Sequence, residues 1–548
     1  MSFPIHSSFS RLALLGLLSL AALSTHAQTT PAASPTPEQI RRWQHLDLQA
    51  DGVPGISADK AYRELLGSRV PTPVVVAVID SGIDSTHQDL KPVLWRNFRE
   101  VAGNGLDDDK NGYTDDVRGW SFLGGPDGRN ITVETLEQTR IYGQYRGQFE
   151  GKTRQVVRKA DRAKFDLYEQ AKASYEKARK AEETRLARLT DALTSNTATF
   201  ERLKQALGTT RLDSGLVHQA ATRQPAVAEA GPVYAFMHRA GMASDEDALK
   251  ALNAAIKGSR NSLEMGLNPD YNPRAIVGDN PKDLRESRYG NPDIQGPDAR
   301  HGTHCAGIIG GLRGNGLGGD GVAGDMVRIM GVRSTPSGDE RDKDVANAIR
   351  YAVDNGAQII SMSFGKDFSP DKAVVDDAMK YAAQKNVLLV HAAGNSGLNT
   401  DKDNNYPSAR YLNGKFIPNQ ITVGASSRLN TSALAAGFSN YGKQTVDVFA
   451  PGVDIYSSTP GNTYATLSGT SMAAPVVAGV AAVLKSYFPQ LSALQLKQII
   501  EQSATPYHTQ VLKPGAKDMV DFATLSKSGG IVNLYEAVKL ADKMTMVK

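Results

Sequence analysis

Residues 74 to 82 have the sequence VVVAVIDSG. Val74 to Ile79 form a continuous apolar run that is rich in β-branched residues, which is typical of a strand buried on both faces of a parallel sheet. Asp80 follows this run directly. Because open α/β sheets bind their ligands at the carboxyl ends of the strands, Asp80 lies where such a sheet places a functional side chain.

Strand and helix patterns alternate after residue 300. Short apolar runs predict strands over residues 358–363, 387–392, 421–425 and 446–449. The segments between and after them predict helices over residues 345–355, 371–384 and 471–487. Helices interleaved with short apolar strands predict an α/β fold with a doubly wound parallel sheet.

Residues 155–207 differ sharply in composition and contain no Gly or Pro. Apolar residues recur there every three or four positions, with a break around Glu182, so we predict a long amphipathic helix with a partly coiled-coil pattern that ends at Gly208. A second helix is expected over 245–257, with Ser244 as its N-cap. We therefore assign residues 135–284 to an all-α insertion, which divides one sheet domain into residues 28–134 and 285–548.

The bulk composition excludes some partners. The chain has 548 residues, more than one compact core needs, and a formal net charge of only +4. So small a charge gives no reason to expect nucleic acid or an anionic membrane surface as a partner. Cys305 is the single cysteine, so no intrachain disulfide forms, and packing or metal ions must hold the chain together.

The N-terminus has the pattern of a secretory signal peptide. Arg11 precedes an apolar run from Leu12 to Leu23, and small residues follow up to Ala27. We expect cleavage after Ala27, removal of residues 1–27, and export to the periplasm or the cell exterior. The alternative is an uncut membrane anchor, although the run is shorter than the roughly 20 residues that span a bilayer. No other segment is long and apolar enough, so no stable membrane span is expected.

Three glycine-rich segments carry the residue types that acyl transfer by a serine requires. They are DSG at 80–82, HGTHCAG at 301–307 and GTSMAAP at 469–475. A serine nucleophile needs a base for its proton, a carboxylate that orients the base, and donors for the oxyanion. An imidazole, with a pKa of about 6.5, suits the role of base. The chain order Asp, His, Ser is that of the subtilisin arrangement.

The same segments closely resemble the signature blocks of subtilisin-like serine peptidases over residues 40–133 and 285–510. By that resemblance Ser471 is the nucleophile at a helix N-terminus, His301 is the general base and Asp80 orients it. A fourth block, AAGNSG at 392–397, resembles the strand end that supplies the oxyanion amide, which assigns this role to Asn395. The resemblance implies a serine endopeptidase that forms an acyl-enzyme on Ser471.

The resemblance also indicates a substrate-binding site. Two segments resemble the extended walls that line the specificity pocket and pair with the substrate backbone, namely Ser363-Phe364-Gly365 and Ala392-Ala393-Gly394. Small residues leave room for a large side chain, and no carboxylate is evident at these positions. We therefore expect a broad or apolar preference. Near the base, His304 is expected to be a packing residue, and Cys305 a small buried hydrophobe.

An acidic loop predicts a calcium site. Asp107, Asp109, Asn111, Gly112 and Asp115 fall at positions 1, 3, 5, 6 and 9 of an EF-hand-like loop, where hard oxygens can converge on Ca²⁺. Position 12 is an arginine where the bidentate Glu usually stands, and the acidic residue at 116 is its candidate replacement. The alternative is an acidic surface turn without metal.

A second calcium candidate rests on the resemblance alone. Asp89, Leu312, Asn315 and Leu317 match the common calcium site of the family, although the Gly-rich residues 314–319 alter the loop length. Structural calcium would suit an exported protein without disulfides.

Two departures from the family leave alternatives open. Only 46 residues (28 to 73) separate the expected cleavage from the first strand, so we expect no separate inhibitory prodomain. The insertion is either a solvated structural arm or an element that gates the cleft or docks a partner or a second copy. For the whole chain, the competing interpretations are a non-enzymatic binding module and a processing protease for one exported partner.

Overall fold

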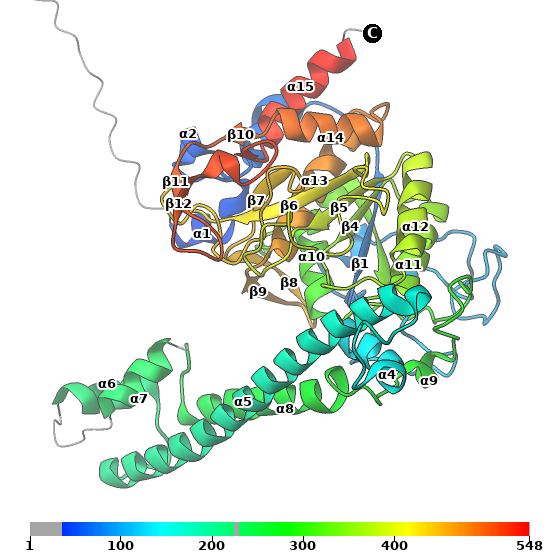
Figure 1. The fold of residues 1–548 in the computed structure, drawn as a ribbon. Helices are drawn as coiled ribbons and strands as arrows, with labels where there is room; N and C mark the ends of the chain where they lie inside the picture. The colour runs from blue at the N-terminus through cyan, green and yellow to red at the C-terminus, as the bar shows by residue number, and fades with distance from the viewer. Residues whose placement is uncertain (1–35, 224–229, 240, 547–548) are drawn as a thin grey trace, which may run out of the picture.

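The computed structural model describes residues 36–223, 230–239 and 241–546 (Figure 1). The expected signal peptide lies outside these residues. At the centre is a nine-stranded sheet with the order β10-β13-β7-β6-β5-β4-β1-β3-β2. Its strands span, in chain order, β1 Val74–Asp80, β2 Gly119–Ser121, β3 Val327–Arg333, β4 Ile359–Met362, β5 Leu388–Ala392, β6 Gln420–Ser426, β7 Val448–Pro451, β10 Thr505–Pro506 and β13 Gly530–Ile531.

Strand β1 is the point at which the strand order changes direction. It pairs in parallel with β3 on one side and β4 on the other, so that Val76 lies between Ile329 and Ile359. The other pairs are parallel too, except β10 with β13. The predicted doubly wound sheet is confirmed, and Asp80 ends the strand at its switch point, where such sheets open a crevice for ligands.

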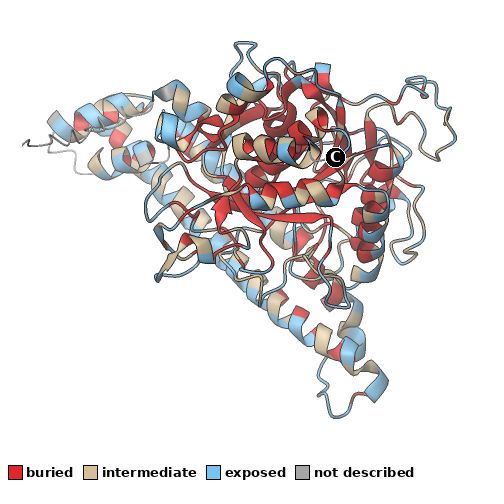
Figure 2. Ribbon diagram, turned by 90° about the horizontal axis from the view of Figure 1, so that it is seen from above, coloured by how far each residue is buried: buried red, intermediate tan, exposed pale blue. Residues whose placement is uncertain are grey.

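Helices cover both faces of the sheet, and the strands between them are buried, as their red colour in Figure 2 shows. Val74 and Val76 contribute to one buried layer, and Ala77 and Ile79 to the other. Since successive side chains of a strand point to opposite faces, a strand buried on both faces needs the continuous apolar run found in the sequence. The helices on the first face are α10 Arg300–Gly310 and α13 Thr470–Tyr487, and those on the second are α11 Asp342–Asp354 and α12 Lys372–Gln384.

Among the described residues, α13 alone is long and apolar enough to cross a bilayer, and 83% of its 18 residues are buried, as in a core helix.

Shorter elements complete the body around the sheet. The remaining helices and hairpins of the body are α1 Pro37–Arg41, α2 Leu48–Asp51, α3 Ala58–Ala61, α9 Arg274–Val277, α14 Ala493–Gln502, α15 Leu534–Met546, β8 Ile455–Thr459 with β9 Thr463–Leu467, and β11 Gln510–Leu512 with β12 Met519–Asp521.

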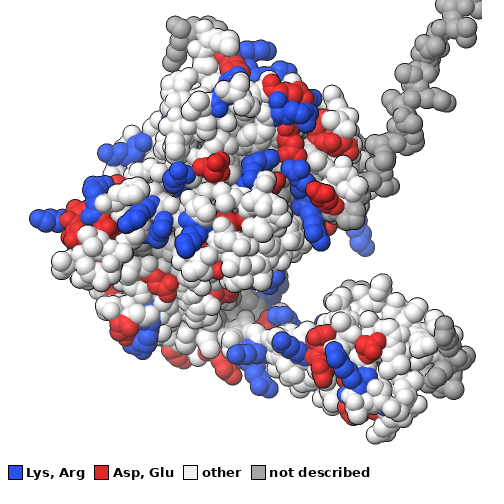
Figure 3. Space-filling model, turned by 180° about the vertical axis from the view of Figure 1, so that it is seen from behind, with Lys and Arg blue, Asp and Glu red and all other residues white. Residues whose placement is uncertain are grey.

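The described residues between 137 and 261 form a helical arm that projects from the body (Figure 1). Seen from behind, its outer part stands clear of the body and carries intermingled basic and acidic side chains (Figure 3). Its helices are α4 Glu137–Phe149, α5 Arg162–Leu207, α6 Ser214–Arg223, α7 Ala230–Arg239 and α8 Asp245–Asn261. Ser244 caps α8 by accepting a hydrogen bond from the backbone of Asp247, as predicted.

The long helix α5 continues through the point near Glu182 at which its apolar pattern is interrupted. Its first part buries Tyr168 and Tyr175 beside α4, and its last part buries Phe200 in the small core at the tip. Between them, Glu182 accepts a hydrogen bond from Ser259 of α8. The apolar stripe is therefore interrupted because α5 changes packing partner there, while its backbone continues to Gly208, which caps the helix in the left-handed conformation.

Candidate active site

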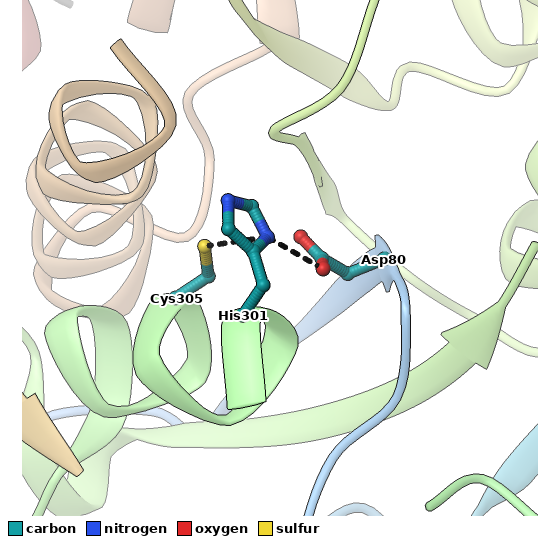
Figure 4. A group of neighbouring side chains, drawn as sticks. All are labelled: Asp80, His301 and Cys305. Carbon is teal, nitrogen blue, oxygen red and sulfur yellow. Dashed lines mark hydrogen bonds and ion pairs between the residues drawn. The ribbon is translucent and has the colours of Figure 1, made fainter. Parts of the chain in front are cut away.

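Asp80 and His301 meet at the carboxyl end of β1. Asp80 Oδ1 accepts a hydrogen bond from His301 Nδ1 at 2.8 Å, which fixes the imidazole with its other nitrogen, Nε2, directed away from the carboxylate (Figure 4). The backbone N–H of Ser81 donates to the same oxygen at 2.7 Å. The carboxyl group is buried, whereas 39% of the imidazole is exposed. A base with one side held and the other open can exchange protons with a substrate.

Two glycines allow this close approach. His301 is the second residue of α10, and a Cβ on the following Gly302 would lie 2.2 Å from the carbonyl oxygen of Gly82. Gly82 itself has φ of +142°, which other residues rarely adopt. The helix N-terminus can therefore pack against the turn after β1 because Gly302 has no side chain, and Gly82 lets the same turn lie against Gln295, whose carbonyl oxygen a Cβ on Gly82 would meet at 2.1 Å.

The charge of Asp80 determines the proton affinity of His301. Burial lowers the pKa of His301, but the negative charge and hydrogen bond of Asp80 outweigh this effect and raise the pKa well above its ordinary value. Since the imidazole is partly exposed, solvent moderates the shift. The pair thus favours the imidazolium that forms when the histidine accepts a proton.

Ser471 lies on the first turn of α13. The N–H groups of a first helical turn have no partner within the helix, and the helix dipole places positive potential there. Pro475, four residues later, has no N–H with which to bond Ser471 in the usual helical pattern. The carbonyl oxygen of Ser471 instead accepts hydrogen bonds from Ser363 Oγ at 2.9 Å and Cys305 Sγ at 3.3 Å.

The Ser471 hydroxyl donates to the carbonyl oxygen of Ser363 at 3.1 Å. No hydrogen bond joins it to His301 among the described residues. Cys305 lies next to both residues, because its sulfur is 3.9 Å from His301 Nδ1 and 3.3 Å from the carbonyl oxygen of Ser471. Hydrogen bonds between a nucleophile and its base are often lengthened or absent without substrate, and rotation about one side-chain bond redirects a serine hydroxyl.

Asn395 presents an amide donor beside Ser471. Its side-chain oxygen accepts hydrogen bonds from the backbone N–H of Thr470 at 2.8 Å and the hydroxyl of Thr470 at 2.9 Å. Because the Thr470 N–H can only donate, the atom facing it must be the oxygen, and the NH₂ group points the other way. Asn395 is exposed, so this donor is available to a ligand next to Ser471.

A cavity of about 230 Å³ opens beside these groups. Of the expected substrate-binding residues it is lined by Ser363, Phe364, Gly365, Ala392 and Gly394, together with Asn395 and Ser471. Ala393 borders a neighbouring pocket instead.

Asp367 lines this cavity as well and brings a carboxylate to its border, beyond the positions considered in the sequence. It was missed because it lies two residues beyond the Ser-Phe-Gly segment.

The subtilase family model matches residues 72–529 of this chain. The chain belongs to the subtilase family. It is 39% identical over 239 residues to a thermophilic serine proteinase of Bacillus sp. (strain AK1), a match that covers 43% of this chain and 53% of that one. It is 38% identical over 242 residues to thermitase of Thermoactinomyces vulgaris, covering 44% and 75%. The match therefore spans about half the length of the first relative.

A solved structure gives a further likeness within the family. The crystal structure of a cold adapted subtilisin-like serine proteinase is 31% identical, with a TM-score of 0.34, and the match covers 42% of this chain and 76% of that one.

His304 of this subtilase lies behind the base. It is buried, and its Nε2 lies 3.0 Å from the carbonyl oxygen of Ala465. Burial lowers its pKa to about 4, so it is neutral near pH 7.

The acidic loop places three carboxylates together. Oxygens of Glu100, Asp107 and Asp109 lie within 4.8 Å of one another, a donor set that fits Ca²⁺. Asn111 lies in the same loop, but its side-chain oxygen accepts from the backbone of Tyr113. Glu100 was not predicted, because it lies outside the EF-hand spacing.

Two acidic residues of this loop have other roles. The carboxylate of Asp115 accepts hydrogen bonds from the backbone N–H groups of Gly103, at 2.7 Å, and Gly105, at 3.0 Å. The carboxyl of Asp116 is held by the hydroxyl of Tyr351 and two asparagine amides, and burial raises its pKa to about 6. Asp115 therefore fixes the loop backbone, and Asp116 holds side chains around the loop, including Asn97, which also donates to Asp109.

The second calcium candidate has a different arrangement. Asp89 Oδ1 accepts a hydrogen bond from the amide nitrogen of Asn315, and Asp89 Oδ2 accepts one from the hydroxyl of Tyr464 at 2.7 Å. The oxygen of Asn315 accepts from the backbone of Leu317. Of the four predicted residues, Asp89 and Asn315 therefore have their side chains together, and hydrogen bonds within the protein occupy both.

Proposed function

We propose that this subtilase is a serine endopeptidase that hydrolyses peptide bonds through an acyl-enzyme on Ser471. The observation that carries this proposal is the 2.8 Å hydrogen bond between Asp80 and His301, next to a serine on the first turn of a helix. His301 accepts the Ser471 proton through Nε2 while Asp80 stabilises the imidazolium. The Asn395 amide and the Ser471 N–H then hold the oxyanion, and His301 returns the proton to the leaving amine.

The direct test is casein hydrolysis by wild type and Ser471→Ala, with fluorophosphonate labelling of the same samples. The proposal predicts hydrolysis and labelling by the wild type and neither by the variant. A folded wild type that is not labelled would instead support a non-enzymatic binding module. Labelling without casein hydrolysis would support a processing protease with one exported substrate.

The substrate preference is proposed to be broad or apolar, because small residues predominate in the two segments, 363–365 and 392–394, that line the cavity. Asp367 at the cavity border offers a carboxylate to a basic side chain, which makes the comparison of Phe, Leu, Arg and Lys before the scissile bond informative. A preference for Arg and Lys that disappears in Asp367→Asn would overturn the apolar assignment.

We also propose that Glu100, Asp107 and Asp109 hold a structural Ca²⁺, which would tie residues 100–109 together in place of a disulfide. Export after removal of residues 1–27 is proposed on the signal-like sequence and is tested by the N-terminal sequence of protein from the periplasm or culture medium. Docking of a partner or a second copy on the helical arm stays a prediction, which light scattering of an arm-deleted variant would test.

A further inference from the structure

The segment 363–367, which we call the wall, lines the substrate cavity. The side chain of Lys366 joins this wall to the root of the helical arm. Its Nζ lies 2.7 Å from Glu137 Oε2 and 2.8 Å from Asp342 Oδ1, and it donates to the carbonyl oxygen of Glu340 at 2.7 Å. Only 2% of the lysine side chain is exposed. Glu137 is the first residue of α4, where the arm leaves the body, so this contact links the arm with the segment that lines the substrate cavity.

Lys366 lies within that wall, between two residues that line the cavity. Gly365 and Asp367 border the cavity, while Lys366 faces the opposite way, as successive residues of an extended segment do. Its backbone N–H and carbonyl exchange hydrogen bonds with Tyr406 at 3.1 and 2.9 Å. Two residues earlier in the same segment, Phe364 bonds to His391 through its carbonyl oxygen at 2.8 Å.

The arm root is rigid where it meets the lysine. Arg140 binds Glu137 with two nitrogens, at 2.6 and 3.1 Å, and the backbone N–H of Glu137 donates to Asp339 Oδ2 at 2.7 Å. Although burial alone would raise the pKa of Glu137, the charges of Arg140 and Lys366 lower it to about 2, so the carboxylate stays charged.

We propose that Lys366 is a positioning residue, through which Glu137 at the arm root holds the wall 363–367 in place for an extended peptide. This inference rests on the proposed peptidase function and makes the insertion part of the substrate-binding apparatus. Among the described residues, the other hydrogen bonds of the wall go to Ser471, His391 and Tyr406 of the sheet domain, so Lys366 is the point at which the insertion acts on it. Substrates that use the wall should depend on this contact, and small acyl substrates that do not reach it should not.

Lys343 offers a matched control at the other root of the insertion. Its Nζ also contacts two carboxylates, Asp279 at 2.9 Å and Glu286 at 2.7 Å, and one carbonyl oxygen, that of Asn280, and its side chain is also 2% exposed. It follows Asp342 on α11, but in the described part of the chain it makes no hydrogen bond or ion pair with the wall. Lys343→Met therefore imposes a comparable loss of buried charge without touching residues 363–367.

The experiment compares wild type, Lys366→Met, Glu137→Gln and Lys343→Met on two substrates, an extended peptide anilide and a small p-nitrophenyl ester. For Lys366→Met we expect kcat/KM on the peptide to fall by about 10- to 100-fold, mainly through KM, because misplacement of a binding group by about 1 Å costs this much. Ester hydrolysis should change less than about twofold. Glu137→Gln should shift KM in the same direction, and Lys343→Met should leave the peptide-to-ester ratio unchanged.

Equal losses on both substrates, or equal behaviour of Lys366→Met and Lys343→Met, would overturn the positioning role. If Lys366→Met does not fold, Glu137→Gln decides by the same criterion. A wild type that is not labelled by fluorophosphonate would refute the proposed peptidase itself, so the two failures are distinguishable.

Discussion

Replacement of Asn395 tests the proposed oxyanion site most directly. In Asn395→Ala the amide that points toward the cavity is lost. Removing one such donor costs about 2.7–4 kcal/mol of transition-state stabilisation, or roughly 10²- to 10³-fold in kcat. Because the oxyanion forms only in the transition state, KM should stay within about twofold. Steady-state kinetics on a peptide anilide measure both constants.

The matched variant Asn395→Asp separates the donor from the fold. The alanine variant leaves the N–H of buried Thr470 without its acceptor, which costs about 1–3 kcal/mol of stability. The aspartate keeps that acceptor but replaces the NH₂ group with a negatively charged oxygen. Its thermal stability should therefore exceed that of Asn395→Ala, while its kcat should be lower still. A kcat for Asn395→Ala within fivefold of wild type, or a more active aspartate variant, would refute the assignment.

Four further predictions concern protons and metal. Asp80→Asn should lower kcat by about 10⁴-fold. In the wild type, kcat/KM should rise with pH, and the midpoint of this rise should lie above 6.5, the usual pKa of histidine. The reason is that Asp80 raises the pKa of His301 and only the neutral imidazole is a base. A midpoint below 6.5 in a pH profile would contradict this. Burial raises the pKa of Glu340 to about 8, so its contribution to stability is complete below about 4.3 and is lost as the pH rises through 8. Urea unfolding of the inactive nucleophile variant should show a loss of up to about 5 kcal/mol between pH 4 and 9, which Glu340→Gln removes; equal pH slopes would exclude this. EDTA should lower the Tm of the wild type by several degrees. It should not lower the Tm of a variant in which Asp107 and Asp109 are both changed to Asn. An equal drop in Tm for both proteins would argue against this calcium site.

The sequence predicted the strands whose apolar runs contain no charged residue. β1, β4 and β5 are buried on both faces, and only Ser361 in β4 and His391 in β5 interrupt their runs, so the strands are easily recognised. β3 was missed because Arg328 and Arg333 interrupt its run. Arg333 is nonetheless buried, and its guanidinium donates to the carbonyl oxygen of Ser81 and the side chain of Asn130. Such acceptors come from distant segments, which no local pattern reveals.

The candidate site was predictable where one short segment carries both the functional group and its support. Gly82 and Gly302 stand near Asp80 and His301 in the sequence. The same motifs therefore contain the functional side chains and the glycines that let their two segments pack closely. Glu100 was not predictable in this way. It joins the carboxylate group only because the loop folds back on itself, outside the EF-hand spacing that the sequence suggested.

The environment of Lys366 illustrates the same limit and bears on how the arm should be tested. In sequence it stands in a Gly-Lys-Asp stretch typical of an exposed turn, and its partner Glu137 is 229 residues away. A buried lysine is tolerated only when it is paired, and removal of one partner leaves an uncompensated charge. Deletion of the whole insertion would therefore remove both the outer arm and a counter-charge of the cleft wall. A deletion that begins after Arg140 and ends before α9 spares Arg274 and Asp279 and so keeps both roots, and a change it causes in activity or oligomeric state then points to the outer arm.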